Sequence, residues 1–161
     1  MSSRSVEQKT TTPETVAAEL RTLDRSLDLL DEGVARSFGI TRSDLRAMEL
    51  VSGDGRLTAG QLADGLGVTT GAVTGLIDRM ERVGYFRRED DPSDRRKVHV
   101  VLTPRAKTRE RQAFERLERD MGRMLSSYRA DELAFIADFL RRTRAIVDQV
   151  GTSSRSTSTG K

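Results

Sequence analysis

The chain has 161 residues, with 28 Lys and Arg against 25 Asp and Glu, so its formal net charge is only +3. That length fits one domain of ordinary size, and so small an excess does not by itself indicate a polyanionic partner. The absence of cysteine excludes disulfide scaffolds, thiolate metal sites and cysteine nucleophiles. No apolar run approaches the roughly 20 residues of a membrane span, and residues 1–12 lack the apolar stretch of a signal peptide. We therefore expect a soluble, cytoplasmic protein without membrane contact.

Both ends of the sequence are polar. Residues 1–12 and 151–161 are rich in Ser, Thr, Lys and Arg and have nothing to bury. We expect both to be disordered tails, and for the basic C-terminal one a solvated end is favoured over a nucleic-acid-binding arm.

Two helices are predicted at the start of the folded region. Thr12-Pro13-Glu14 supplies a hydroxyl cap, a proline at the first helical position and an acid near the positive end of the dipole. Apolar residues then recur at steps of three and four up to residue 38: Val16, Leu20, Leu23, Leu27, Leu30, Val34 and Phe38. Thr41 begins a shorter helix in which Asp44 is placed to close a capping box, and residues 53–55 are expected to break it.

Residues 57–84 predict two short helices joined by a tight turn. Thr58 and Gln61 form a capping-box pair for the first helix, Gly67 permits the turn, and Thr69 or Thr70 caps the second. This arrangement is a helix-turn-helix unit, although helical hairpins also occur in proteins that never bind DNA.

The second of these helices has two unlike faces. One face carries Val73, Leu76, Ile77 and Met80. The opposite face carries Gly71, Gly75, Asp78 and Arg82, flanked by Thr74 and Arg79. A glycine costs roughly 1 kcal/mol in a helix relative to alanine, so two of them favour a surface that another body approaches closely, such as the floor of a DNA major groove. A poorly optimised solvent face is the alternative.

Two extended stretches, 85–89 and 97–103, follow and flank the turn-rich segment DDPSDRRK of residues 90–97. A hairpin directly after a helix-turn-helix is a wing, whose arginines are attracted to the negative potential of a narrow minor groove. An ordinary charged turn is the alternative. From Pro104 onward two amphipathic helices are predicted, separated by a break near residues 126–129, and they carry more apolar surface than a small winged helix can cover.

The run LTAGQLADGLGVTTGAVTGLIDRMERVGYFRREDDPSDRRKVHVVLTPRAK, residues 57–107, resembles the MarR family of winged-helix transcriptional regulators. Asp94 and Arg96 match the D-x-R element of that family's wing. The resemblance extends over about residues 13–150 and implies a mainly α, α+β winged-helix domain. Its DNA-binding core would be 40–107 and its dimerisation helices 13–38 and 104–150. Gly75 is a departure, because many members carry a long polar or basic side chain there, so the operator sequence cannot be transferred from relatives.

The resemblance implies a homodimeric, sequence-specific regulator, usually a repressor, that binds a near-palindromic duplex and is released by a small, often anionic aromatic ligand. We expect phosphate binding at the helix start and groove contacts from the outer face. Arg96 would enter the minor groove with Asp94 holding its guanidinium, while neighbouring cations contact the DNA backbone. The full DNA-contacting set is Thr69, Thr70, Gly71, Thr74, Arg79, Asp94, Arg95, Arg96 and Lys97. The ligand would lie near Leu30, Phe38, Met48 and Phe114.

Two other functions stay open: a constitutive or architectural DNA-binding protein without an effector, and an interaction module whose winged helix no longer binds DNA. The sequence has no phosphate-cradling glycine loop, nucleophile elbow or metal-ligand spacing. We therefore expect no enzyme activity, no cofactor and no metal. As a DNA-binding protein it would be located on the nucleoid.

Overall fold

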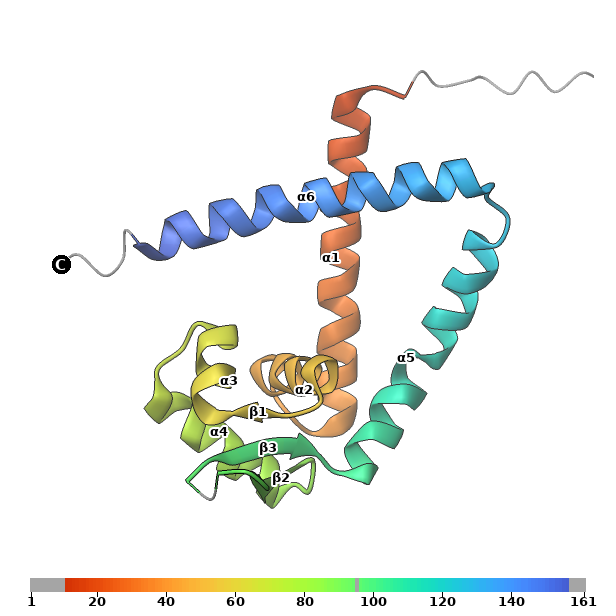
Figure 1. Cartoon of the computed structure of the whole chain (residues 1–161). Coiled ribbons are helices and arrows are strands. Elements are labelled where there is room, and N and C mark those ends of the chain that lie inside the picture. The colour runs from red at the N-terminus through yellow and green to blue at the C-terminus, as the bar shows by residue number, and fades with distance from the viewer. Residues whose placement is uncertain (1–10, 95, 157–161) are drawn as a thin grey trace, which may run out of the picture. The chain divides into compact units, whose positions relative to one another are not determined.

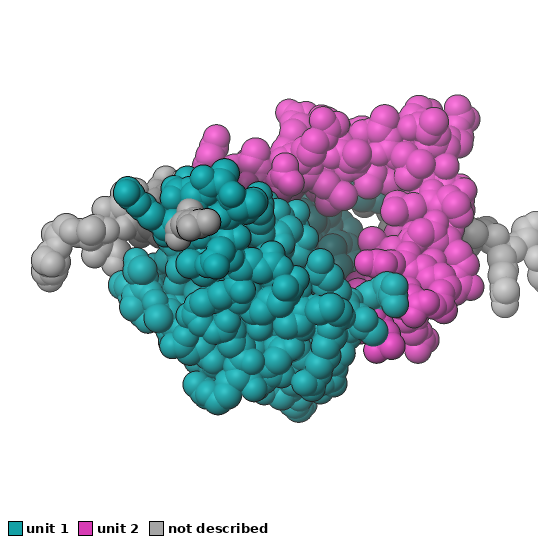
Figure 2. Space-filling model, turned by 60° about the horizontal axis from the view of Figure 1, so that its bottom comes forward, with its two compact units in different colours: residues 1–111 teal, residues 112–161 magenta. Residues whose placement is uncertain are grey.

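The computed structural model describes residues 11–94 and 96–156, without the side chains of 152–156. The chain forms two compact units, residues 1–111 and 112–161, with the boundary inside helix α5 (Figure 2). The expected N-terminal tail lies almost entirely outside the described residues. The expected C-terminal tail needs a correction, because helix α6 continues to Ser156. No proline interrupts residues 151–156, and each residue added to an existing helix gains a hydrogen bond without a new nucleation cost.

The first unit contains a helix-turn-helix and a three-stranded antiparallel sheet. Its elements are α1 (Pro13–Phe38), α2 (Arg42–Asp54), β1 (Leu57–Thr58), α3 (Ala59–Leu66), α4 (Thr70–Arg82), β2 (Phe86–Asp90), β3 (Val98–Leu102) and the first turns of α5 (Pro104–Leu125). Strand β3 lies between β1 and β2 (Figure 1). The mainly helical winged-helix fold is thereby confirmed. Strand β1 was not anticipated, because two residues are too short for a periodic signal and form a strand only by pairing with β3.

The predicted helix starts are confirmed in atomic detail. The hydroxyl of Thr12 accepts from the Thr15 amide at 3.3 Å, and the capping boxes at Thr41 and Thr58 are both complete. Of the two candidates before α4, Thr69 is the cap. The break predicted at 53–55 occurs later than expected, since α2 runs through Gly53 and ends only where Gly55 adopts a φ of 80°.

The core of the first unit lies between α2, α3, α4 and the sheet. Its buried side chains include Leu45, Ala47, Met48, Val51, Leu62, Ala63, Val73, Leu76, Ile77, Met80, Val100 and Leu102. The inner face of α4 is therefore fixed by packing, and this leaves its opposite face on the surface. In α1 only the C-terminal end joins this core, through Val34, Ala35 and Phe38.

The second unit consists of the remainder of α5 and helix α6 (Ala130–Ser156), joined by a turn at residues 126–129. The amide of Arg129 donates to the Glu132 carboxylate at 2.7 Å and caps the start of α6. None of the described side chains between residues 112 and 151 is buried. Among the described helices, none combines the length and apolar character that crossing a bilayer requires.

Candidate nucleic-acid interface

The outer face of α4 is exposed, and its first two turns carry only small side chains or none. Gly71, Thr74, Gly75 and Asp78 all lie on the surface. A Cβ placed on Gly71 or Gly75 would meet no atom beyond the local helix within 4 Å. The two glycines therefore do not make room for a neighbouring part of the same unit, and they leave the helix backbone open to an external surface.

The start of α4 presents the threonines predicted to bind phosphate. Thr69 accepts from the Ala72 amide at 3.3 Å, and the Thr74 hydroxyl donates to the carbonyl of Thr70 at 2.9 Å. Thr69 and Thr70 are both exposed beside the first amides of the helix, where the dipole favours an anion.

Arg79, predicted to line or flank the groove-facing surface, is paired with a buried acid of α2. Its Nε donates to Oδ2 of Asp44 at 3.2 Å, and its Nη2 donates to the other oxygen of the same carboxylate. Asp44 is fully buried on α2 and also accepts from the amide and hydroxyl of Thr41 at 3.0 and 2.8 Å. Burial alone would raise the pKa of Asp44, but the hydrogen bonds from Arg79 and Thr41 hold that pKa below its ordinary value. The capping-box motif predicted Asp44 but gave no signal for its partner 35 residues away.

The β2–β3 hairpin, residues 86–102, is called the wing below. Its loop is organised by Asp91, whose Oδ1 accepts from the Ser93 amide at 2.7 Å, the Ser93 hydroxyl at 2.5 Å and the Asp94 amide at 3.0 Å. These hydrogen bonds lower the pKa of Asp91 to about 2. The Asp91 amide also donates to the carbonyl of Lys97 at 2.9 Å and closes the loop. Of the predicted wing cations, Arg95 lies outside the described residues.

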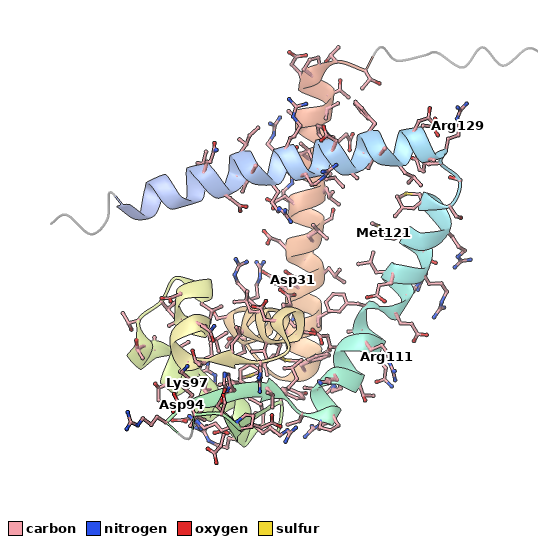
Figure 3. All side chains as sticks on the ribbon, in the orientation of Figure 1. Asp31, Asp94, Lys97, Arg111, Met121 and Arg129 are labelled. Carbon is pink, nitrogen blue, oxygen red and sulfur yellow. The ribbon has the colours of Figure 1, made fainter. Side chains whose placement is uncertain are left out.

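Asp94 orients the loop backbone and not, as predicted, the guanidinium of Arg96. Its Oδ1 accepts from the Arg96 amide at 3.1 Å, because a short Asp side chain reaches the backbone two residues on. Its Oδ2 lies 3.9 Å from Nζ of Lys97. Asp94 and Lys97 lie on the loop of the wing (Figure 3). The Arg96 guanidinium is exposed and has no ion-pair partner within the described part of the chain, so it is available to an external anion.

Sequence reasoning missed a link between α4 and the wing. Arg88 on β2 donates from Nη2 to Asp78 at 2.7 Å and from Nη1 to Glu81, while its amide donates to Glu81 Oε1 at 3.1 Å. The partners are seven and ten residues apart, across a turn, which is outside the spacings that signal side-chain pairs within a helix or strand.

The predicted ligand residues do not line an open site in the first unit. Met48 is fully buried in the core, and Phe38 packs against Tyr85 with 5.8 Å between ring centroids. The guanidinium of Arg109 lies 4.8 Å above the Phe38 ring and donates to Tyr85 Oη at 2.7 Å. Phe38 and Met48 are thus buried side chains of the first unit.

Leu30 and Phe114 are half-buried and belong to different compact units. Within the first unit a polar cleft of about 220 Å³ is lined by Asp31, Arg42, Ser43, Leu45, Arg46 and Glu49. Arg42 is already engaged with Asp28 there, whereas Arg46 has no ion-pair partner among the described residues. The cleft therefore holds one cation without an ion pair among the described residues, alongside the carboxylates of Asp31 and Glu49. Burial and the nearby Asp31 raise the pKa of Glu49, while Arg46 acts against them.

The sequence and the fold are both similar to known proteins. A sequence model of the MarR family matches residues 38–97, from the end of α1 through the wing loop. The uncharacterised HTH-type transcriptional regulator YcgE of Bacillus subtilis is 32% identical over 121 residues, which cover 75% of this chain and 79% of YcgE. The multiple antibiotic resistance protein MarR of Salmonella typhimurium is 30% identical over 121 residues, covering 74% of this chain and 84% of its own.

Among solved structures, a MarR family protein from Bacillus stearothermophilus is 25% identical, with a TM-score of 0.61 over 86% of this chain and 99% of that one. These relatives are transcriptional regulators and not enzymes. The winged helix-turn-helix with its exposed α4 is thus the DNA-binding element of a regulator, and the chain belongs to the MarR family of transcriptional regulators.

Proposed function

We propose that this regulator is a homodimeric repressor that inserts α4 into the major groove and Arg96 into the adjacent minor groove of a near-palindromic operator on the nucleoid. The exposed, glycine-flattened outer face of α4 is the observation that carries this proposal, because a helix face without bulk allows close backbone approach to a groove floor. Thr69 and Thr70 bind phosphate at the helix start, and Arg95 and Lys97 contact the DNA backbone.

The proposed dimer is supported by apolar side chains that the single chain leaves exposed. In α1 these are Leu23, Leu27 and Leu29; in α5, α6 and the turn between them they are Leu117, Met121, Met124, Tyr128, Phe135, Leu140, Ile146 and Val147. Exposed apolar surface of this extent is typical of protein–protein interfaces. A two-fold dimer would place its recognition helices about 34–36 Å apart, one turn of DNA.

We infer that a small anionic aromatic compound releases the repressor from DNA. The cleft between α1 and α2 supports this assignment, since Arg46 is available there to a carboxylate. Calorimetric titration with benzoate, and with benzyl alcohol as the uncharged control, tests it. Release requires tighter benzoate binding to free protein than to the DNA complex. Equal affinities would favour a constitutive DNA-binding protein instead.

The DNA contact of the wing is tested with Arg96→Ala on a duplex selected from random oligonucleotides by the wild-type protein. Loss of the Arg96 charge near the DNA phosphates should weaken binding. It should also reduce the slope of log affinity against log salt concentration by about 0.9. Arg116→Ala, at an arginine on α5 that is 91% exposed, is the matched control and should leave the slope unchanged. An unchanged affinity and slope for Arg96→Ala would remove the wing from the interface.

A further inference from the structure

We propose that Arg88 is a positioning residue, which holds the wing at a fixed angle to α4 so that the recognition helix and Arg96 engage DNA together. This inference rests on the proposed DNA contacts of α4 and the wing. It assigns a function to the three-residue cluster of Arg88, Asp78 and Glu81, called the α4–wing clamp below.

The α4–wing clamp is held by three hydrogen bonds on a partly exposed surface. Arg88 Nη2 donates to Asp78 Oδ1 at 2.7 Å and Nη1 donates to Glu81 Oε2. The backbone amide of Arg88 donates to Glu81 Oε1 at 3.1 Å. The Glu81 carboxylate therefore holds both the side chain and the main chain of one strand residue, and a guanidinium shared by two carboxylates is fixed in direction as well as in distance.

The position of Arg88 in the sheet explains why its amide is free for this contact. Strand β2 is an edge strand, since the order is β1–β3–β2. Arg88 lies opposite Val100 of β3, and its amide bonds to Glu81 on α4. An edge amide would otherwise be left to solvent or to another strand. Here the Glu81 carboxylate of α4 accepts that amide hydrogen bond.

Among the described residues of the wing, Arg88 is the one nearest the loop that makes a hydrogen bond to α4. Nearer the base, Tyr85 and Phe86 are buried in the core. Beyond Arg88, His99 of β3 still pairs with Thr58 of β1, but strand β2 makes no further polar contact with α4 among the described residues, and Val98 of β3 is 42% exposed. The end of β2 lies about 7 Å further along the strand, so a rotation of the stem at Arg88 displaces the loop that carries Arg96.

The clamp also changes the charge of the DNA-facing surface. Asp78 belongs to the outer face of α4, where a bare carboxylate would repel phosphate. Its ion pair with Arg88 reduces that repulsion, although Arg88 is shared with Glu81 and the three side chains together keep a net charge of −1. Loss of Arg88 would therefore free the wing and leave Asp78 uncompensated at the same time.

A double-mutant cycle on affinity for the selected duplex tests the positioning role. Arg88→Ala is expected to weaken binding about tenfold in the wild-type background. In the Arg96→Ala background the same change should cost less than about threefold, because a wing that has lost its groove contact gains little from being held in place. A tenfold loss in both backgrounds would overturn the proposal and indicate that Arg88 acts independently of the wing.

Glu81→Ala separates positioning from simple electrostatics. Removal of one acid near DNA raises affinity if charge alone matters, whereas loss of the clamp lowers it. We expect affinity to fall about fivefold, although the variant is one charge more positive. Asp64→Ala, at an exposed acid on α3 that makes no ion pair with the described residues, is the matched control and should bind at least as tightly as the wild type. Tighter binding by Glu81→Ala would contradict the proposal.

These measurements distinguish failure of the clamp from failure of the proposed interface. If Arg96→Ala itself binds like the wild type, the wing contact is absent and the proposed function is wrong. If Arg96→Ala is impaired while Arg88→Ala and Glu81→Ala are not, only the clamp is wrong. Thermal unfolding of each variant identifies a general loss of fold. Arg88→Lys keeps the positive charge but lacks the planar guanidinium that reaches both carboxylates, and its affinity for DNA is expected to stay reduced.

Discussion

Asp44 is the one polar or charged side chain that is buried in the described core, and Arg79 is its charged partner. Arg79→Ala would leave a buried carboxylate without its counter-charge. We expect the free energy of unfolding to fall by about 2–3 kcal/mol, less than for a fully buried pair, because Thr41 still donates two hydrogen bonds and Arg79 is 43% exposed. Urea denaturation measures the loss.

The control for this prediction is Arg82→Ala, near the end of the same helix, where the exposed arginine has no ion pair within the described residues. Its effect should stay within about 0.5 kcal/mol. If both variants were equally stable, the Asp44–Arg79 pair would contribute nothing beyond an exposed ion pair.

The loop of the wing should depend on pH through Asp91. The pKa of Asp91 is lowered to about 2, below its unfolded value of roughly 3.9. A depressed pKa contributes stability that is present above the unfolded value and is lost as the pH falls through the folded one. Between about pH 4 and pH 2 the amide resonances of Ser93 and Asp94 should therefore shift as their hydrogen bonds to Asp91 break. Asp91→Asn should show no such transition in this range, and a transition that persists in Asp91→Asn would assign it to another group.

Helix α4 packs one apolar face into the core, and its outer face carries two poor helix formers, Gly71 and Gly75. Gly75→Ala places a methyl group where no neighbouring atom lies within 4 Å. The free energy of unfolding should therefore rise by about 0.5–1 kcal/mol. If the same face rests on a groove floor, affinity for the selected duplex should fall roughly tenfold, about 1.4 kcal/mol.

The matched control is Gly33→Ala on α1, which also meets no atom within 4 Å. It should stabilise the fold to a similar extent and leave DNA affinity unchanged. Opposite changes in stability and affinity are expected only at the α4 position. A Gly75→Ala protein that binds DNA as tightly as the wild type would show that this part of α4 does not approach the duplex closely.

For the whole molecule, the exposed apolar side chains of α1, α5 and α6 lead us to expect a dimer in which they are buried. Phe135 is 74% exposed in the single chain, and Phe135→Glu should shift the protein from dimer to monomer in sedimentation equilibrium, because burial of a charge at an interface is costly. Gln112→Glu, at an exposed polar position of α5, should remain dimeric. A wild-type protein that sediments as a monomer would contradict the proposed assembly.

How far the sequence could predict the site depended on the range of the interactions. The Thr41, Thr58 and Thr69 caps join residues within one helical turn, so spacing alone predicted the first two and reduced the third to Thr69 or Thr70. The contact of Asp44 with Arg79, 35 residues away, has no such spacing. The Asp94–Arg96 motif correctly marked the wing, but a backbone hydrogen bond replaced the expected contact with the guanidinium.

The alternation of apolar and polar residues determined the helix-turn-helix, the hairpin and the inner face of α4, since burial of one face follows from periodicity alone. Only the tertiary structure decided which polar groups meet across that framework. It joined Arg88 to α4, turned Arg79 toward a buried acid, and placed Phe38 and Met48 in the core. These choices depend on where whole elements pack, and free energies of packing are gained between residues that no local pattern relates.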